Sequence, residues 1–176
     1  GISVALIAVI AHRILILRQL EKDWVRATHL DDHDTKVSII QRTLDRGYMN
    51  QEAYDLIKRL ADFGDAEWQF RFAEINMDPN KHPDGKENYD RGYIYYDYAS
   101  EQGHAIASFK QGDMHESGVG VIIQDLNIAF SLYQKAFEQG YRKAAAIAIL
   151  ALPYDIRGFD SDSPEYAKYD QASQED

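Results

Sequence analysis

Hydrophobic residues recur at intervals of three and four along most of the chain, which is the spacing of one face of an α-helix. Runs of this kind cover residues 34–47, 50–64 and 65–77, and similar runs follow as far as residue 152. The only β-branched run, Val-Gly-Val-Ile-Ile at residues 119–123, contains Gly120 and follows Gly118, so it predicts a turn rather than a strand. The pattern predicts an all-α protein.

Three glycines punctuate these helical runs at nearly constant spacing. Gly64, Gly103 and Gly140 lie 39 and 37 residues apart, and an alanine follows each of them within four residues. Glycine at a helix C-terminus adopts the left-handed conformation without a Cβ penalty, and a small alanine lets the next helix approach closely. Pairs repeated at this period stack into a solenoid. We therefore predict a helical-repeat domain at residues 34–152: a short α-solenoid of antiparallel helical pairs at about 51–77, 88–117 and 126–152.

The N-terminal residues 1–17 are hydrophobic and are interrupted only by His12 and Arg13. Eleven uninterrupted apolar residues are fewer than the roughly 20 that span a bilayer. Three interpretations stay open: a retained single-pass anchor, a helix buried in the protein or covered by a partner, and a cleaved or interfacial segment. We expect a hydrophobic helix at residues 1–28 that precedes the repeats. Its candidate membrane-contacting side chains are Ile2, Val4, Leu6, Ile7, Val9 and Ile10.

Composition narrows the classes of partner. The chain has 19 basic and 29 acidic residues and a net charge of −10, which opposes binding to nucleic acid and to anionic lipid headgroups. It contains no cysteine, so disulfides, thiolate metal sites and a thiol nucleophile are excluded. Residues 153–176 are strongly acidic and have little apolar periodicity, which predicts a solvated, poorly ordered acidic tail.

Candidate catalytic chemistry is sparse. His29 and His33 have the i, i+4 spacing that can seat a metal on a helix, but the surrounding aspartates make an acidic inter-helix loop the preferred interpretation. The acidic segment that starts at Asp78 is excluded as a calcium loop because Pro83 occupies the position that requires glycine. The sequence contains no phosphate-binding loop, nucleophile elbow or HExxH motif. We predict no catalytic residue, no metal, no cofactor and no small-molecule substrate.

Residues 103–144, GHAIASFKQGDMHESGVGVIIQDLNIAFSLYQKAFEQGYRKA, resemble a Sel-one-like repeat, a relative of the tetratricopeptide repeat. The resemblance departs at Gln111 and His115, where leucine and tyrosine are usual. It is weaker over residues 51–77 and does not extend to residues 1–47. The residues that define the repeat by this resemblance and by the glycine spacing are Gly64, Gly103, Gly112, Gly118, Gly120, Ala129, Tyr133, Ala136 and Gly140.

Alignment of the repeats places Tyr95 and Tyr96 in the core. Tyr89, Tyr93 and Tyr98 lie on the same predicted helix at positions that the repeat does not need for packing. Tyrosine is enriched where proteins meet because it joins an apolar ring to a polar tip. These three residues are the candidate partner-binding set.

The resemblance implies a non-enzymatic adaptor for protein–protein interaction: a membrane-tethered bacterial scaffold that assembles or positions an envelope or secretion complex. If residues 1–17 form a single-pass tether, the expected location is the bacterial inner membrane, where the resemblance implies a periplasmic repeat domain with a membrane or periplasmic protein as partner. The basic residues after the hydrophobic segment favour the cytoplasmic side instead. The alternative is an immunity-type inhibitor that neutralises a secreted toxin, and a third hypothesis is a metal-dependent enzyme that uses His29 and His33.

Overall fold

The computed structural model describes residues 38, 49, 51–120 and 122–175. Residues 55–176 form one compact unit. The first described helix, α3, begins before this unit, and its residues from Asp55 onward belong to it. The predicted N-terminal helix, its membrane-contacting side chains and the His29–His33 pair lie outside the described residues. The helices are α3 (Gln51–Asp62), α4 (Ala66–Met77), α5 (Tyr89–Glu101), α6 (Ala105–Ser117), α7 (Leu126–Glu138), α8 (Arg142–Ala151), α9 (Tyr154–Arg157) and α10 (Pro164–Gln174).

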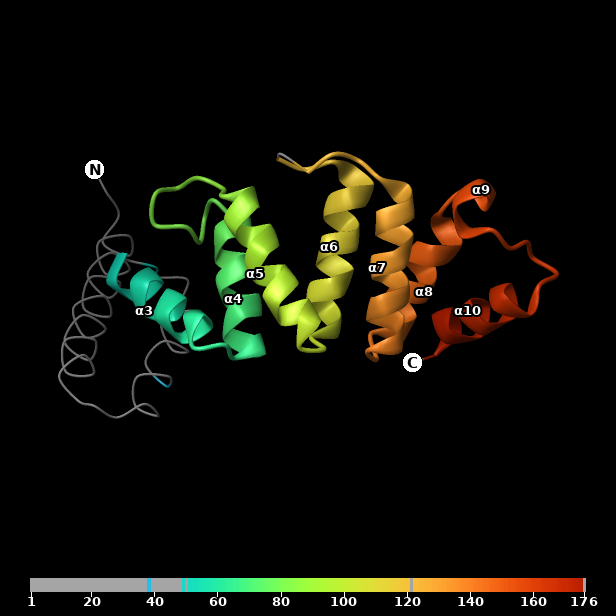
Figure 1. Ribbon diagram of the computed structural model, residues 1–176, viewed down its shortest axis with the longest axis horizontal. Helices are drawn as coiled ribbons and strands as arrows, with labels where there is room; N and C mark the ends of the chain where they lie inside the picture. The colour runs from blue at the N-terminus through green and yellow to red at the C-terminus, as the bar shows by residue number, and fades with distance from the viewer. Residues whose placement is uncertain (1–37, 39–48, 50, 121, 176) are drawn as a thin grey trace, which may run out of the picture. The chain divides into compact units, whose positions relative to one another are not determined.

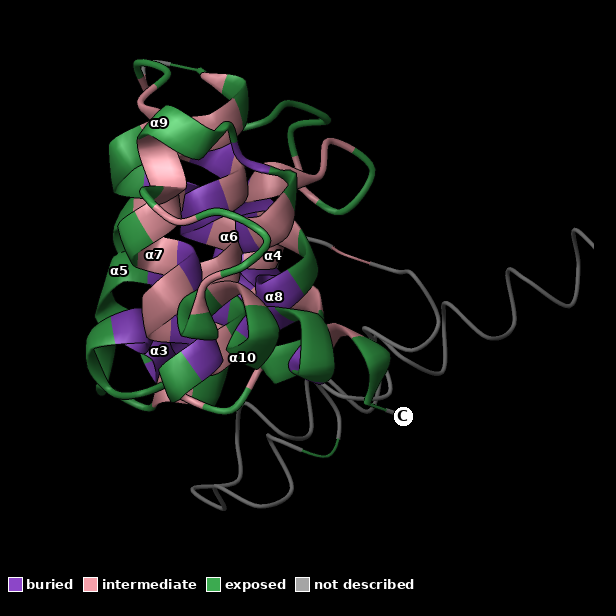
Figure 2. Ribbon diagram, turned by 90° about the vertical axis from the view of Figure 1, so that its right-hand side faces the viewer, coloured by how far each residue is buried: buried purple, intermediate pink, exposed green. Residues whose placement is uncertain are grey.

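The described residues contain helices and no strand, and α4 to α7 stand side by side in chain order (Figure 1). The prediction of an all-α solenoid is confirmed. None of these helices is long and apolar enough to cross a membrane. Figure 2 shows that the buried residues lie on the inward-facing sides of the helices, as the three-and-four spacing requires.

Helix ends are set by a short list of side chains. Asp65 caps α4 by accepting a hydrogen bond from the Trp68 amide, and Asp125 caps α7 through the Ile128 amide. At the opposite ends, Gly64, Gly103 and Gly140 have φ of +96°, +89° and +108°. All three therefore have the left-handed backbone that the glycine spacing predicts.

The repeat pairs differ in phase from the predicted ones. α4 packs most extensively against α5, and α6 against α7, whereas α5–α6 and α7–α8 meet over smaller areas at the glycine turns. The predicted pairs at 88–117 and 126–152 are thus neighbours across a turn and not the main packing units. The reason is that Tyr96 and Tyr133, on the second helix of each true pair, are fully buried and fill the space beneath the preceding helix.

Small residues let the paired helices approach. A Cβ on Gly112 would lie 2.5 Å from Cε1 of Tyr133, so glycine makes room for that ring. In the preceding pair the arrangement is reversed, because Ala73 is on the first helix and Gly92 on the second. A Cβ on Gly92 would lie 2.6 Å from Sδ of Met77.

The C-terminal residues correct the prediction of a poorly ordered tail. They form α9 and α10, and α10 packs against α8. Tyr169 is 4% exposed and Ala172 is fully buried. These two residues follow Tyr133 and Ala136 by 36 residues, so α10 is placed as the second helix of a third pair. The acidic side chains of this segment face away from the core, which allows its negative charge to stay solvated.

Candidate protein-binding surface

The three candidate tyrosines do not share one surface. Tyr89 lies against Gly120, where a Cβ on that glycine would come within 2.6 Å of the Tyr89 Cβ. The hydroxyl of Tyr93 hydrogen-bonds Nε2 of His115 at 3.0 Å. Tyr98 is 51% exposed and packs edge-on against Tyr95. Tyr89 and Tyr93 thus have intramolecular partners, and Tyr98 presents its ring to solvent.

Gln111 and His115, the two residues that depart from the repeat pattern, form a polar cluster with side chains of α5. Gln111 is almost fully buried and donates from Nε2 to the Asp97 carboxylate at 3.1 Å. His115 lies one turn further along α6 and contacts Tyr93. Burial raises the pKa of the Tyr93 hydroxyl, and the nearby Asp97 carboxylate adds to this effect. An apolar contact of the usual repeat is replaced here by hydrogen bonds.

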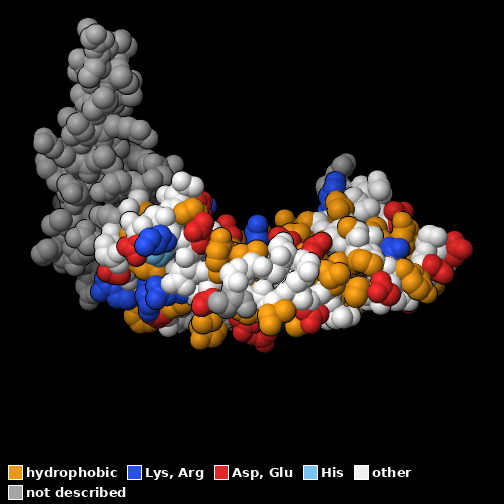
Figure 3. Space-filling model, turned by 90° about the horizontal axis from the view of Figure 1, so that it is seen from above, with side chains coloured by type: hydrophobic (Ala, Val, Ile, Leu, Met, Phe, Trp, Pro, Cys, Tyr) orange, Lys and Arg blue, Asp and Glu red, His pale blue; other side chains and the backbone are white. Residues whose placement is uncertain are grey.

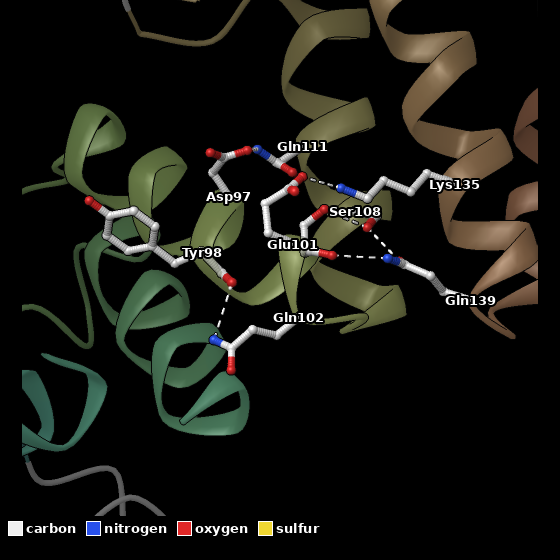
Figure 4. Close-up of polar contacts among 9 residues, drawn as sticks. Asp97, Tyr98, Glu101, Gln102, Ser108, Gln111, Lys135 and Gln139 are labelled. Carbon is white, nitrogen blue, oxygen red and sulfur yellow. Dashed lines mark hydrogen bonds and ion pairs between the residues drawn. The ribbon is translucent and has the colours of Figure 1, made fainter. Parts of the chain in front are cut away.

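A polar network holds α5 in place against its neighbours (Figure 4). Ser108 donates to Oε1 of Gln139 at 2.6 Å, and Nε2 of Gln139 donates to the Ser100 carbonyl at 2.9 Å. Glu101 forms an ion pair with Lys135 at 2.5 Å, and this lysine holds the pKa of the Glu101 carboxyl below its usual range. The network therefore fixes α5 relative to both α6 and α7.

The Tyr98 side chain extends from α5 away from that network (Figure 4). One turn before it, Ile94 is 46% exposed, so an isoleucine and a tyrosine lie next to each other on the outer face. Asp90, Asp97 and Glu101 are exposed on the same helix. We call the five residues Asp90, Ile94, Asp97, Tyr98 and Glu101 the α5 stripe. Ile94 was not among the predicted residues, although its i, i+4 spacing from Tyr98 is visible in the sequence.

A groove of about 310 Å³ lies between α4 and α6 on another side of the same pairs. The Tyr96 hydroxyl donates a hydrogen bond to Glu74, and the Tyr133 hydroxyl lies within hydrogen-bond distance of two carboxylates, Glu116 and, at 3.0 Å, Asp113. Burial and the neighbouring carboxylates raise the pKa of both tyrosine hydroxyls, so they stay protonated as donors. Burial also raises the pKa of the Asp113 carboxyl. Glu74 and Asp113 in this groove thus accept hydrogen bonds from buried tyrosines of the neighbouring helices.

Negative charge is concentrated in the compact unit. Residues 55–176 contain 12 basic and 22 acidic residues, which accounts for the entire net charge of −10. No group of three or more histidine or acidic side chains in the described part of the chain has the geometry of a metal site. The surface favours a partner with basic groups around an apolar centre.

Two comparisons with known proteins bear on this arrangement. The family model of the Sel1 repeat matches residues 83–104 and 105–141. The second match spans α6 and α7, two helices that pack extensively against each other. Residues 83–141 of the chain thus match the Sel1 repeat. Sel1 repeats are generally non-catalytic modules for protein–protein interaction.

A crystal structure of a Sel1 repeat protein from Oxalobacter formigenes has the same fold. Its TM-score is 0.60 at 24% sequence identity, and the alignment covers 90% of this chain and 64% of that one. This chain therefore spans less than two thirds of the length of that Sel1 repeat protein. At this identity the likeness shows that the two chains share the solenoid fold.

Proposed function

We propose that this chain is a non-enzymatic adaptor that binds a protein partner through the α5 stripe. The observation that carries the proposal is the pair Ile94 and Tyr98, two large hydrophobic side chains about half exposed on a helix that is otherwise rigidly held. Exposed aromatic groups on a rigid support anchor protein interfaces at low cost in conformational entropy. The carboxylates around them favour a partner with a basic rim.

The test compares variants of the full chain in binding a partner captured by cross-linking. Tyr98→Ala and Ile94→Ala should each weaken partner binding about tenfold or more, because truncation of a central anchor costs about 1–4 kcal/mol. Ile147→Ala is the matched control: Ile147 is 52% exposed but lies on α8. Its binding should be unchanged. Equal binding by all three variants would place the interface elsewhere.

We further propose that the adaptor is tethered to the bacterial inner membrane through residues 1–17 and holds its partner within an envelope or secretion complex. The uninterrupted hydrophobic run of residues 1–11 supports the tether. Leu6→Arg with Ile10→Arg should move the protein from the membrane fraction to the soluble fraction of its native cell. Retention of the double variant in the membrane fraction after alkaline washing would contradict the tether. A reporter fused after residue 176 tests for the periplasmic side.

An immunity-type inhibitor is the second candidate, and the charge of the compact unit favours it. An acidic surface can block a basic toxin, and such a complex would be soluble and of nanomolar affinity, about −12 kcal/mol. An adaptor would instead co-purify with membrane components. Recovery of a one-to-one soluble complex with a basic secreted protein would replace the scaffold proposal with this one.

A further inference from the structure

A pocket of about 600 Å³ lies at the C-terminal end of the solenoid, apart from the α5 stripe. Its walls come from α7, α9, α10 and the loop between α9 and α10. This volume is within the range of sites that hold small ligands or single side chains. Figure 3 shows hydrophobic and acidic side chains mixed on the surface at this end. Its aromatic walls are Phe130, Tyr154, Phe159 and Tyr169.

Arg157 is the basic residue that lines this pocket, and its guanidinium group lies near two aromatic rings. Its guanidinium carbon lies 5.5 Å from the centre of the Phe159 ring and 5.4 Å from that of Tyr166. Nη1 donates to the Leu150 carbonyl at 3.2 Å, and Nε has no hydrogen-bond partner. These contacts hold the guanidinium plane in one place, which prepares it for a planar anion.

No acidic side chain among the described residues forms an ion pair with Arg157, although it lies in the most acidic part of the chain. Asp160, an acid in the pocket wall, instead accepts a hydrogen bond from the Asp162 amide at 3.2 Å. A guanidinium favours carboxylate partners, which match its paired N–H groups. The pocket therefore contains a positioned cation that lacks an anion.

We propose that this pocket binds the C-terminal residue of a partner protein whose last side chain is aromatic or aliphatic. Such a residue carries a carboxylate and an apolar side chain on the same carbon atom, which matches one guanidinium beside aromatic walls. An internal aspartate or glutamate has no apolar group next to its carboxylate. Asp160 and Glu165 in the wall disfavour a segment with several negative charges.

The test is an NMR titration of the full chain with short peptides. The first peptide is acetyl-Gly-Ser-Gly-Ser-Phe with a free C-terminus, the second is the same peptide as its C-terminal amide, and the third ends in glycine with a free C-terminus. The free phenylalanine peptide should bind at least tenfold more tightly than either of the others, with shifts centred on Phe159 and Tyr169.

Two variants locate the determinants. Arg157→Gln should remove the preference for the free acid over the amide. Tyr154 is 60% exposed, so Tyr154→Ala should leave the melting temperature unchanged while weakening the free-acid peptide about threefold or more, and it keeps the test valid if Arg157→Gln does not fold. Equal binding of acid and amide, equal binding of the glycine peptide, or no binding at millimolar peptide would overturn the proposal. Each result is independent of whether the α5 stripe binds a partner.

Discussion

Single small residues determine where this chain turns and how closely its helices pack. Gly103 is needed for its backbone conformation, since its φ is +89° and an added Cβ would meet no atom within 4 Å. Gly112 is needed for space, because the Tyr133 ring occupies the position that a Cβ would take. Two glycines nine residues apart therefore serve different physical purposes, and substitution distinguishes them.

At Gly103 the cost of substitution should come from the backbone alone. Gly103→Ala and Gly103→Val should each lower the free energy of unfolding by about 1–2 kcal/mol, because both force a Cβ-bearing residue into the left-handed region. Chemical denaturation measures both variants. Stability unchanged by both substitutions would contradict the requirement for a left-handed backbone at this position.

At Gly112 the cost should come from steric overlap. Gly112→Ala should destabilise by about 1–2 kcal/mol net, because displacement of the buried Tyr133 ring outweighs the gain in helix propensity. Gly92→Ala is the matched control, since its Cβ meets the flexible end of Met77, which can move aside. We expect a change of about 0.5 kcal/mol or less there. Equal losses at both glycines would contradict the packing described for Tyr133.

Asp113 should make stability depend on pH. Because burial raises the pKa of its carboxyl above the ordinary value of 3.8, the unfolded chain loses this proton first as the pH rises. The contribution of Asp113 to stability therefore falls between pH 3.8 and the folded-state pKa. Asp113→Asn should match the wild type at pH 3 and be more stable at pH 7, as denaturant titrations at both values would measure. Lower stability of the variant at pH 7 would contradict this.

At the scale of elements, much of the helix layout is predictable from the sequence. Helix positions follow from the three-and-four spacing, and the turns at Gly64, Gly103 and Gly140 are encoded in a residue type that tolerates positive φ. Which helices pair is less predictable, because both neighbours of α6 contact it, and the buried ring of Tyr133 on α7 makes the larger interface.

Three other features were beyond sequence reasoning. The first is α10, because its acidic composition is typical of a solvated tail. Its one sign of a repeat helix is that Tyr169 and Ala172 have the same spacing as Tyr133 and Ala136. The separation of Tyr98 from Tyr93 follows from helix geometry, but the selection of Tyr98 as the exposed one depends on His115 binding Tyr93. The position of Arg157 depends on α9, a four-residue helix with little pattern of its own.

The integration of α10 into the core is testable. Tyr169→Ala should lower the free energy of unfolding by about 3 kcal/mol or more, because it leaves a cavity beside Phe137 and Phe159. Tyr154→Ala, at an exposed tyrosine in the same segment, should change it by about 0.5 kcal/mol or less. Differential scanning calorimetry compares the two. A Tyr169→Ala variant as stable as the wild type would contradict the packing of α10 into the core and would favour a tail that contributes nothing to stability.

At the scale of the whole molecule, the packed helical pairs present a strongly acidic surface. Hydrogen bonds from Gln139 and the ion pair of Lys135 join successive pairs, so the α5 stripe is presented in one orientation. Apolar anchors on such a support favour binding without rearrangement. The surrounding negative charge should make association with a basic partner slower at high salt.

The most direct test of the central claim is photo-cross-linking in the native cell from single positions on the full chain. A photoreactive phenylalanine analogue replaces Tyr98 in one strain and Ile147 in another, two side chains with nearly equal exposure on different helices. The account predicts one discrete cross-linked protein from position 98 and none from position 147. A partner that cross-links from position 147 and not from position 98 would contradict it.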